Sequence, residues 1–325
     1  MSFMRAARYS SLGPAASVLT VDSIPIPKPG PNEVRVRLAF SGVNPTDVKS
    51  RSGAVPRELP EFQIPHHDGA GVIDIVGGNV DPSRIGERVW VMLAAFGSVY
   101  GTAAEYCIVN SSRALPLPDS VEPALGATLG VPAVTAAYCV LGDGPVDGSV
   151  VLVQGGAGGV GRCAVQLAVW AGATVVATAS TQERQQAALD AGAHYAFDYR
   201  DPNVAEHVRK AVGSVDRIIE VNLAANLDTD IQVSRPGTVV VVYAADGEDP
   251  VIPRRSLMTA GLTLEFMLLY TIGPERLAAA VTAVEAALTD GALTMPSTRY
   301  FELDDIVAAH EAQESGSEQR VLIRC

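Results

Sequence analysis

Lysine is scarce in this chain of 325 residues, and positive charge is in deficit. Its only lysines are Lys28, Lys49 and Lys210, and 36 acidic residues face 24 basic ones, which gives a net charge of −12. A surface of this sign disfavours nucleic acid or an anionic membrane as the main partner. No run of 18 uncharged apolar residues occurs, and the N-terminus lacks an apolar signal core. We therefore expect neither a membrane span nor a secretory leader.

Cysteine is also rare. Cys107, Cys139, Cys163 and Cys325 are widely spaced and form no C-x-x-C motif, so the sequence signals neither a zinc lobe nor a redox pair. Buried free thiols in a reducing cytoplasm are the preferred interpretation. The chain is 48% hydrophobic and 18% charged, as expected of a globular enzyme, and it is long enough for two domains.

Glycine, in contrast, is abundant, and one cluster of glycines has an informative context. An apolar strand is predicted at residues 150–153, a helix begins inside the following turn, and a second strand ends at Ser180. The turn fits G-x-G-x-x-G and consists of Gly156, Ala157, Gly158, Gly159, Val160 and Gly161. Such glycines let the backbone approach a pyrophosphate at the helix N-terminus. The pattern predicts a dinucleotide site; a structural glycine turn in a nucleotide-free domain is the alternative.

The end of the second strand indicates which dinucleotide binds. NAD sites place Asp or Glu there for the ribose hydroxyls, whereas this chain has Ser180 and Thr181, with Arg184 one turn further on. An arginine can pair with a 2′-phosphate through its fork of donors. We therefore predict NADPH as the cofactor. The alternative is that Arg184 is an ordinary solvated arginine on a helix surface.

The periodicity of apolar residues changes near residue 125. Before it, the segments 34–38, 69–76, 87–93 and 101–109 read as short strands between Gly and Pro, which suggests a small barrel. After it, predicted helices at 125–141 and 161–171 introduce an alternation of strands and helices that implies a doubly wound parallel sheet. A helix at 273–290 and strands at 297–302 and 320–323 end the chain. The fold class predicted is α/β.

Several motifs outside the glycine turn occur in a characteristic order. They are Gly42-Val43-Asn44-Pro45-Thr46-Asp47, Arg51-Ser52-Gly53, Pro65-His66-His67-Asp68-Gly69-Ala70-Gly71-Val72, Gly86-Glu87-Arg88-Val89, Ala104-Glu105-Tyr106, Val131-Pro132-Ala133-Val134-Thr135 and Gly192-Ala193. Together they resemble the medium-chain dehydrogenase/reductase superfamily, and within it the zinc-free, zeta-crystallin-like quinone oxidoreductases. The resemblance covers nearly the whole chain.

The resemblance implies a domain organisation. A GroES-like β-barrel catalytic domain would comprise residues 1–125 and 265–325, and a Rossmann domain for NADPH would comprise residues 126–264. It also implies a homodimer that pairs through residues 239–269.

The resemblance further implies site residues. Ser180, Arg184 and Tyr199 match a 2′-phosphate pocket, and Thr135 and Asn44 match residues near the nicotinamide. Lys49 matches a further cofactor contact, and Arg320 occupies a basic position near the C-terminus. Segments that touch the adenosine or nicotinamide ends match Asn226, Tyr243, Ala244, Ala245, Asp246, Phe266, Met267 and Leu268.

Metal is not predicted. The related zinc alcohol dehydrogenases carry Cys where this chain has Asn44, and no cysteine matches their third ligand position. A catalytic zinc needs about three protein ligands. His67 stands where those enzymes have a histidine, so we interpret it as an active-site or hydrogen-bonding residue. A packed or capping histidine without a chemical role remains an equal alternative.

Hydride chemistry without a metal restricts the substrate. A quinone or activated enone needs only a hydride, correct orientation and donors for the oxygen that gains charge. Asn44, Asp47 and Lys49 are the candidates, with Asp47 as a cap or turn residue weighed equally. Gly53 is followed by Ala54, Val55 and Pro56 rather than by the tyrosine of enoyl-thioester reductases.

The function predicted is that of a cytoplasmic NADPH-dependent quinone or enone reductase. The alternatives are an enoyl reductase of a biosynthetic pathway and a non-catalytic NADPH-binding structural or regulatory protein.

Overall fold

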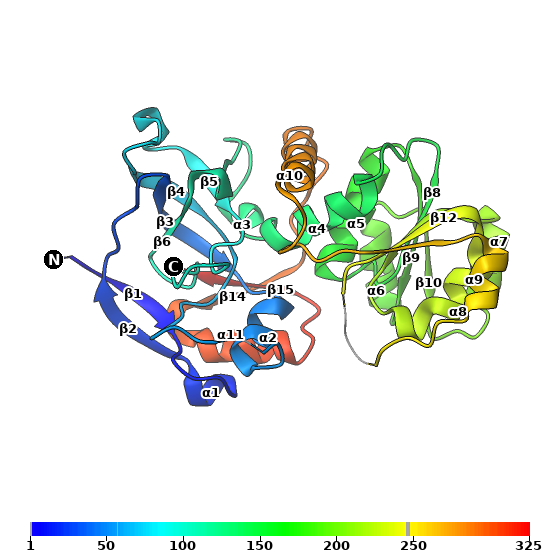
Figure 1. Cartoon of the computed structure of the whole chain (residues 1–325), viewed down its shortest axis with the longest axis horizontal. Helices are drawn as coiled ribbons and strands as arrows, with labels where there is room; N and C mark the ends of the chain where they lie inside the picture. The colour runs from blue at the N-terminus through cyan, green and yellow to red at the C-terminus, as the bar shows by residue number, and fades with distance from the viewer. Residues whose placement is uncertain (1, 57, 245–247) are drawn as a thin grey trace. The chain divides into compact units, whose positions relative to one another are not determined.

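The computed structural model describes residues 2–56, 58–244 and 248–325, which form two compact units (Figure 1). Unit 1 consists of residues 1–131 and 295–325, and unit 2 of residues 132–294. Two segments thus lie in a different unit from the one expected. Residues 126–131 were expected in the Rossmann domain and lie in unit 1, and residues 265–294 were expected in the GroES-like domain and lie in unit 2. The reason is that the strand at 263–266 pairs in parallel with the preceding strand of the unit 2 sheet, Val242 opposite Phe266.

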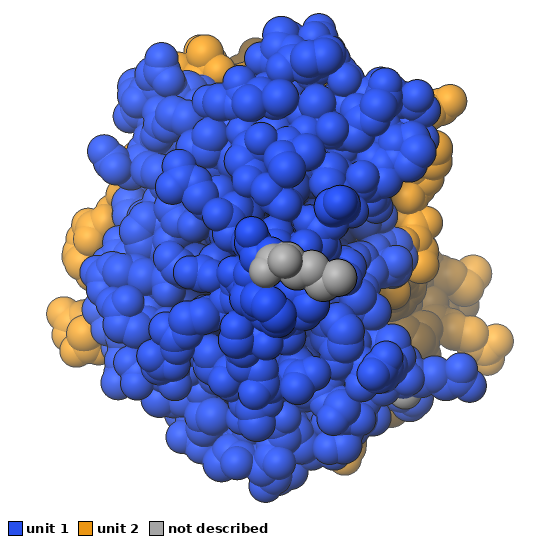
Figure 2. Space-filling view, turned by 90° about the vertical axis from the view of Figure 1, so that its left-hand side faces the viewer, with its two compact units in different colours: residues 1–131, 295–325 blue, residues 132–294 orange. Residues whose placement is uncertain are grey.

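Unit 1 is built around a mixed sheet, and the two segments that form it make one continuous body (Figure 2). Its strands run in the order β14-β15-β3-β4-β5-β7, and β6 pairs with β3. Strands β1 and β2 form a separate two-stranded antiparallel sheet. The strands are β1 (Phe3–Arg8), β2 (Thr20–Pro25), β3 (Glu33–Gly42), β4 (Asp68–Val76), β5 (Arg88–Val91), β6 (Tyr106–Asn110), β7 (Ala114–Pro116), β14 (Thr298–Glu302) and β15 (Arg320–Arg324). The helices are α1 (Ala15–Val18), α2 (Pro45–Ser52), α3 (Pro123–Gly126) and α11 (Ile306–Glu314), with 3-10 turns η1 (Pro82–Arg84), η2 (Ser111–Arg113) and η3 (Leu303–Asp305).

Strand β3 shows why this sheet forms. Its alternating sequence buries Val34, Val36 and Leu38 in an apolar cluster, while Arg35 on the other face forms a salt bridge with Asp74, 2.7 Å away. A period of two is what a sheet with one buried face requires. The predicted strand is confirmed, and it extends to Gly42, next to the polar residues described below.

Unit 2 is a parallel sheet in the order β10-β9-β8-β11-β12-β13. In chain order these are strands 3-2-1-4-5-6, the arrangement of a doubly wound dinucleotide-binding fold, in which ligands bind where the order reverses, here between β8 and β11. The predicted α/β class is confirmed. The strands are β8 (Val150–Val153), β9 (Thr174–Ala179), β10 (Tyr195–Asp198), β11 (Val215–Glu220), β12 (Ser234–Val242) and β13 (Thr263–Phe266). The helices are α4 (Gly130–Leu141, starting in unit 1), α5 (Gly159–Trp170), α6 (Gln182–Asp190), α7 (Val204–Val212), α8 (Leu223–Val233), α9 (Arg254–Ala260) and α10 (Pro274–Thr289).

The predicted helix at 125–141 is instead two helices, α3 and α4. The second begins at Gly130, where the backbone N–H of Val131 donates to the carboxylate of Asp68, 2.8 Å away, and a Cβ at Gly130 would overlap that carboxylate. The side chain from β4 therefore fixes where α4 starts. Among the helices of the described residues, none is long and apolar enough to cross a bilayer.

Candidate functional site

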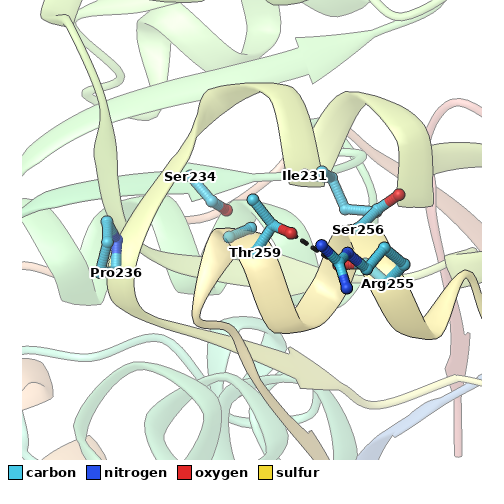
Figure 3. A pocket seen from close by; sticks show the side chains of 7 residues that line it. Ile231, Ser234, Pro236, Arg255, Ser256 and Thr259 are labelled. Atoms are coloured by element: carbon cyan, nitrogen blue, oxygen red, sulfur yellow. Dashed lines mark hydrogen bonds between the residues drawn. The ribbon is translucent and has the colours of Figure 1, made fainter.

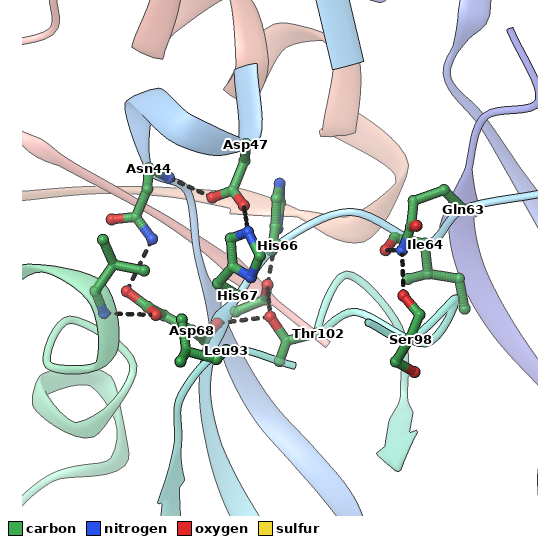
Figure 4. A network of polar contacts seen from close by, with 12 residues as sticks. Asn44, Asp47, Gln63, Ile64, His66, His67, Asp68, Leu93, Ser98 and Thr102 are labelled. Atoms are coloured by element: carbon green, nitrogen blue, oxygen red, sulfur yellow. Dashed lines mark hydrogen bonds and ion pairs between the residues drawn. The ribbon is translucent and has the colours of Figure 1, made fainter. Parts of the chain in front are cut away.

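A buried polar cluster in unit 1 brings together three of the four predicted catalytic residues (Figure 4). Asn44 caps α2 just before Pro45, and the Asp47 carboxylate accepts the Asn44 backbone N–H at 2.7 Å. The Asn44 side chain is 1% exposed, and its Nδ2 donates to Asp68 Oδ2 at 2.8 Å. From the sequence, Asp47 is weighed both as a catalytic residue and as a cap or turn residue. The structure gives both interpretations a basis, because Asn44 and Asp47 cap the helix and also line one polar cluster. We call Asn44, Asp47, His67, Asp68 and Arg320 the Asp47–Asp68 cluster.

The two carboxyls of this cluster hold their protons unusually tightly. Burial raises the pKa of Asp68 to about 6, against the opposing effects of Arg320 and the Asn44 amide. Burial, followed by the negative charge of Asp68, raises the pKa of Asp47 well above its usual range. A carboxyl kept neutral near pH 7 can donate a proton, so the cluster contains a candidate acid.

His67 adjoins this acid. Its Nε2 lies 3.9 Å from Asp47 Oδ1, and the residue is 7% exposed. Lys49, the fourth predicted catalytic residue, is half-buried on α2. The nearness of His67 to Asp47 gives the cluster two groups between which a proton can be exchanged.

His66, to which the sequence assigned no role, belongs to a buried hydrogen-bonded chain. It has a left-handed backbone with φ of 77°. Its Nδ1 lies 2.8 Å from Ser41 Oγ, and its Nε2 lies 3.0 Å from His310 Nε2. A non-glycine residue with this backbone is strained and needs support from its surroundings. The two ring contacts supply that support directly before His67 and Asp68.

The donor and the acceptor of each hydrogen bond in this chain can be assigned by starting from Thr102. The Thr102 hydroxyl donates to the Asp68 carbonyl oxygen at 2.6 Å, so Ser41 Oγ must donate to Thr102 Oγ1, 2.7 Å away. His66 Nδ1–H then donates to Ser41, and His66 Nε2 accepts from His310 Nε2–H. Both rings are neutral in this arrangement. Burial agrees with it, since it lowers the pKa of His66 well below its usual value and that of His310 to about 3.

Arg320 joins the cluster from β15. Its guanidinium lies 3.6 Å from Asp68 and donates to the Val43 carbonyl. This predicted cofactor residue thus contacts residues around Asn44. Sequence reasoning missed Asp68 as a member of this cluster, and it missed Ser41, Thr102 and His310, which form the hydrogen-bonded chain with His66. The P-H-H-D run named Asp68 as part of a motif, but its partners are distant in sequence.

The glycine turn of unit 2 has the geometry that a pyrophosphate site requires. It joins β8 to α5, which begins at Gly159, and the first N–H groups of a helix have no acceptor inside it. A Cβ at Gly161 would overlap the Gly155 carbonyl oxygen, whereas one at Gly158 would lie 3.3 Å from the same atom. Gly161 is therefore needed for packing of the helix on the turn, and Gly158 leaves open space above the turn.

Three predicted contacts for a 2′-phosphate gather beyond the same sheet edge. Ser180 follows β9 and Tyr199 follows β10, and these strands pair with Ala179 opposite Asp198. Thr181 caps α6 by accepting the Arg184 N–H at 3.2 Å, which places Arg184 in the first turn of that helix. The structure thus brings Ser180, Arg184 and Tyr199 to one edge.

The remaining predicted cofactor residues differ in exposure. Thr135 on α4 and Met267 are buried, while Phe266 and Leu268 are 66% and 53% exposed. Asn226 Nδ2 donates to Glu220 at 2.9 Å. Tyr243 and Ala244 follow β12 and are half-buried, and Ala245 and Asp246 lie outside the described residues.

A bound metal ion requires several ligand side chains that are held close together. No group of three or more His, Cys, Asp or Glu side chains within residues 2–56, 58–244 and 248–325 is arranged to hold an ion.

A separate shallow cavity of about 490 Å³ lies between α8, β12 and α9 and is lined in part by Ser234, Arg255 and Thr259 (Figure 3). None of the predicted site residues lines this cavity.

Comparison with known proteins adds independent findings. The family "Alcohol dehydrogenase GroES-like domain" matches residues 30–119, which confirms the GroES-like domain, and the family "Zinc-binding dehydrogenase" matches residues 159–286. The quinone oxidoreductase of Sus scrofa is 32% identical over 96% of this chain and 93% of its own length.

Two solved structures illustrate the range of similar folds. A mycobacterial protein solved in complex with NADPH is 27% identical over 99% of this chain and 100% of its own, with a TM-score of 0.85. A thermostable alcohol dehydrogenase from Pyrobaculum aerophilum, solved with cobalt and zinc, is 26% identical over the full length of both chains, with a TM-score of 0.83.

Proposed function

Because this chain belongs to the quinone oxidoreductase branch of the medium-chain dehydrogenase/reductase superfamily, we propose that it is an NADPH-dependent reductase that delivers hydride to a quinone or an activated enone without zinc. The observation that carries the proposal is the Asp47–Asp68 cluster, which offers one neutral acid, Asp47, and the Asn44 amide where a zinc enzyme needs a thiolate and further ligands.

The residues of unit 2 fit NADPH. Gly158 leaves space for close approach, the N-terminus of α5 offers N–H groups to the pyrophosphate, and Arg184 with Ser180 and Tyr199 suits a 2′-phosphate. When bound, NADPH supplies the hydride. Its presence in the mycobacterial neighbour supports the same choice here.

The residues of unit 1 fit the proton chemistry. A quinone oxygen that gains charge during reduction needs a donor and then a proton. Asp47 keeps its proton because it is buried beside Asp68, and His67 lies 3.9 Å away as the group that passes it on. Asn44 and Arg320 hold Asp68 in place. We assign no step to Lys49.

The proposal includes a reaction without zinc. The alternative is a zinc-dependent reaction, because one structural neighbour is an alcohol dehydrogenase solved with cobalt and zinc. The side chain at the position of the zinc family's cysteine is an amide, and its donor group is already bound to Asp68. Neutral amides are poor zinc ligands compared with thiolates, imidazoles and carboxylates.

We also propose a cytoplasmic homodimer. All four cysteines are free thiols, which suits a reducing compartment. Strand β13 is the edge of the unit 2 sheet, and large apolar side chains on it and in the segment that precedes it are exposed, including Val251 at 90%, Met258 at 78% and Phe266 at 66%. Exposed apolar groups beside an open strand edge are typical of a surface that another chain covers.

The cofactor assignment is tested with Arg184→Ala. Loss of a charge-assisted hydrogen bond to the 2′-phosphate should weaken NADPH binding by about 10–150-fold while the affinity for NADH stays within about twofold. Fluorescence titration of each cofactor measures this, with Arg200→Ala, an exposed arginine near Tyr199, as the control. Equal weakening of both cofactors would show that Arg184 supports the fold and does not recognise the phosphate.

A further inference from the structure

Two buried carboxyls face each other beneath the glycine turn. Glu220 is the last residue of β11, and Asp230 lies on α8; both are 0% exposed. Each carboxyl shifts the pKa of the other, and each keeps one buried oxygen that no donor of the described residues reaches, so the two groups interact directly. Neither residue appears among the site residues that the sequence indicated, and the proposed reaction does not use them.

The contacts of this pair require a proton between them. Glu220 Oε1 accepts from the Asn222 backbone and from Asn226 Nδ2, and Asp230 Oδ1 accepts from Gln154 Nε2 at 2.8 Å. Glu220 Oε2 and Asp230 Oδ2 are buried oxygens that no N–H or O–H group of the described chain reaches. Two ionised carboxylates in contact inside a protein repel each other strongly. A single shared proton satisfies both remaining oxygens.

The proton belongs on Asp230. Glu220 has two N–H donors on one oxygen, which favour its negative charge, whereas Asp230 has one. Asp230 Oδ2–H then donates to Glu220 Oε2. Burial and the charge of Glu220 raise the pKa of Asp230 well above its usual range, in agreement with this assignment.

A chain of buried hydrogen bonds connects this pair to the turn. Asp230 accepts from Gln154, the residue that follows β8, and Gln154 Oε1 accepts from the Thr178 hydroxyl at 2.6 Å. Thr178 Oγ1 in turn accepts the backbone N–H of Gly155 at 3.2 Å. On its other side the pair holds the start of α8 through Asn222 and Asn226.

We propose that Glu220 and Asp230 share one proton and act together as positioning residues for the NADPH site, holding the glycine turn through Gln154 and Thr178 and the start of α8 through Asn226. This rests on the proposed NADPH function. Glu220 ends β11, and Gln154, which binds Asp230, follows β8, so the pair adjoins the point where the strand order reverses and where a doubly wound sheet binds its ligand.

Within the described part of the chain, no charged group other than the two carboxyls themselves is among the causes that shift their pKa values. The arginines of the packed elements make their contacts elsewhere: Arg209 of α7 with the Gln232 carbonyl, Arg217 of β11 with Asp143, and Arg235 of β12 with Asp216. Asp228 on α8 and Arg254 and Arg255 on α9 are exposed.

The test compares isosteric amides. In Asp230→Asn the amide donates to Glu220 as the acid did, and in Glu220→Gln the amide donates to an ionised Asp230. Each single variant should keep its NADPH dissociation constant within about threefold of wild type at pH 7. The double variant places donor against donor, so its affinity should fall more than tenfold, a strong departure from additivity. Asp228→Asn is the matched control on the same helix.

The pH dependence of unfolding is a second readout, which reports whether the folded pair retains a proton. A folded state that retains a proton lost by the unfolded chain becomes less stable as pH rises above about 4, with the unfolding constant increasing by up to tenfold per pH unit. Urea unfolding from pH 5 to 9 should show this in wild type and Asp228→Asn, and a flatter profile in Asp230→Asn.

Additive effects of the two amides, or the same pH profile in Asp230→Asn as in wild type, would overturn the shared proton. A double variant that is destabilised but binds NADPH normally would overturn the positioning role. If wild type itself binds no NADPH, the proposed function fails, while the unfolding profiles still report the proton.

Discussion

Burial decides the chemistry of single residues in unit 1. Asp68 is fully buried with one amide and one guanidinium near its carboxylate, and Asp47 lies beside it, so both carboxyls bind protons more tightly than exposed ones. The sequence could suggest Asn44 and Asp47 as candidates from their motif. It could not show that the Asn44 amide is bound to Asp68, because that contact joins residues far apart in the chain and depends on where β4 lies.

Asp68 should make the protein less stable as the solution becomes less acidic. Its folded pKa of about 6 lies above the unfolded value, so the folded state binds the proton more tightly, and this group's contribution falls as pH rises from about 4 to 6. The full difference amounts to about 3 kcal/mol at most. Asp68→Asn should therefore flatten the decline in urea-unfolding free energy between pH 4 and 6.5.

The fully exposed Asp119 provides the control for this experiment, because Asp119→Asn removes the same charge without a buried partner. If Asp68→Asn and Asp119→Asn give the same profile as wild type, Asp68 titrates like an exposed carboxyl and cannot hold a proton for the cluster.

At the scale of elements, local patterns predicted β3, β8, α5 and α10, because each has its own apolar period or glycine signal. They did not predict the break between α3 and α4. The stretch 125–141 is apolar throughout and is interpreted as one helix although Gly126, Gly130 and Pro132 lie inside it, and the Asp68 carboxylate from another element sets the start of α4 at Gly130. Contacts distant in sequence therefore account for the errors at this scale.

Two glycines of the turn have different roles: Gly161 allows the helix to pack on the turn, and Gly158 allows the cofactor to approach it. Gly161→Ala should lower both the unfolding free energy and NADPH affinity, because its Cβ would overlap the Gly155 carbonyl oxygen. Gly158→Ala should change the unfolding free energy by about 1 kcal/mol or less, since only a 3.3 Å contact forms, while NADPH affinity falls at least tenfold. Urea unfolding and fluorescence titration measure the two effects.

Gly273→Ala is the control, since a Cβ there meets nothing within 4 Å and the backbone has an ordinary φ of −62°. Normal NADPH binding by Gly158→Ala would place the pyrophosphate away from this turn.

At the scale of the whole molecule, the two-unit organisation was predictable from the change in periodicity near residue 125, but its second boundary was not. The helix at 274–289 could pack in either unit as far as its own pattern shows, and the pairing of β13 with β12 decides that it follows the parallel sheet. The oligomeric state stays a prediction.

Sedimentation should give a particle of twice the 33.9 kDa chain mass. Met258→Asp places a charge at an exposed apolar position of α9, in the segment before β13, and should shift the equilibrium toward single chains, whereas Phe3→Asp, at an exposed apolar position of unit 1, should not. A wild-type protein that sediments as a single chain at micromolar concentration would contradict the dimer.

The most direct test of the account is the reduction of a quinone by purified wild-type protein whose zinc content is measured in the same sample. We expect oxidation of NADPH at a rate that depends on the quinone, with far less than one zinc per chain and no loss of rate in a chelator. Activity that disappears with the chelator and returns with zinc would contradict the metal-free mechanism, and NADPH binding without turnover of any quinone or enone would contradict the enzyme.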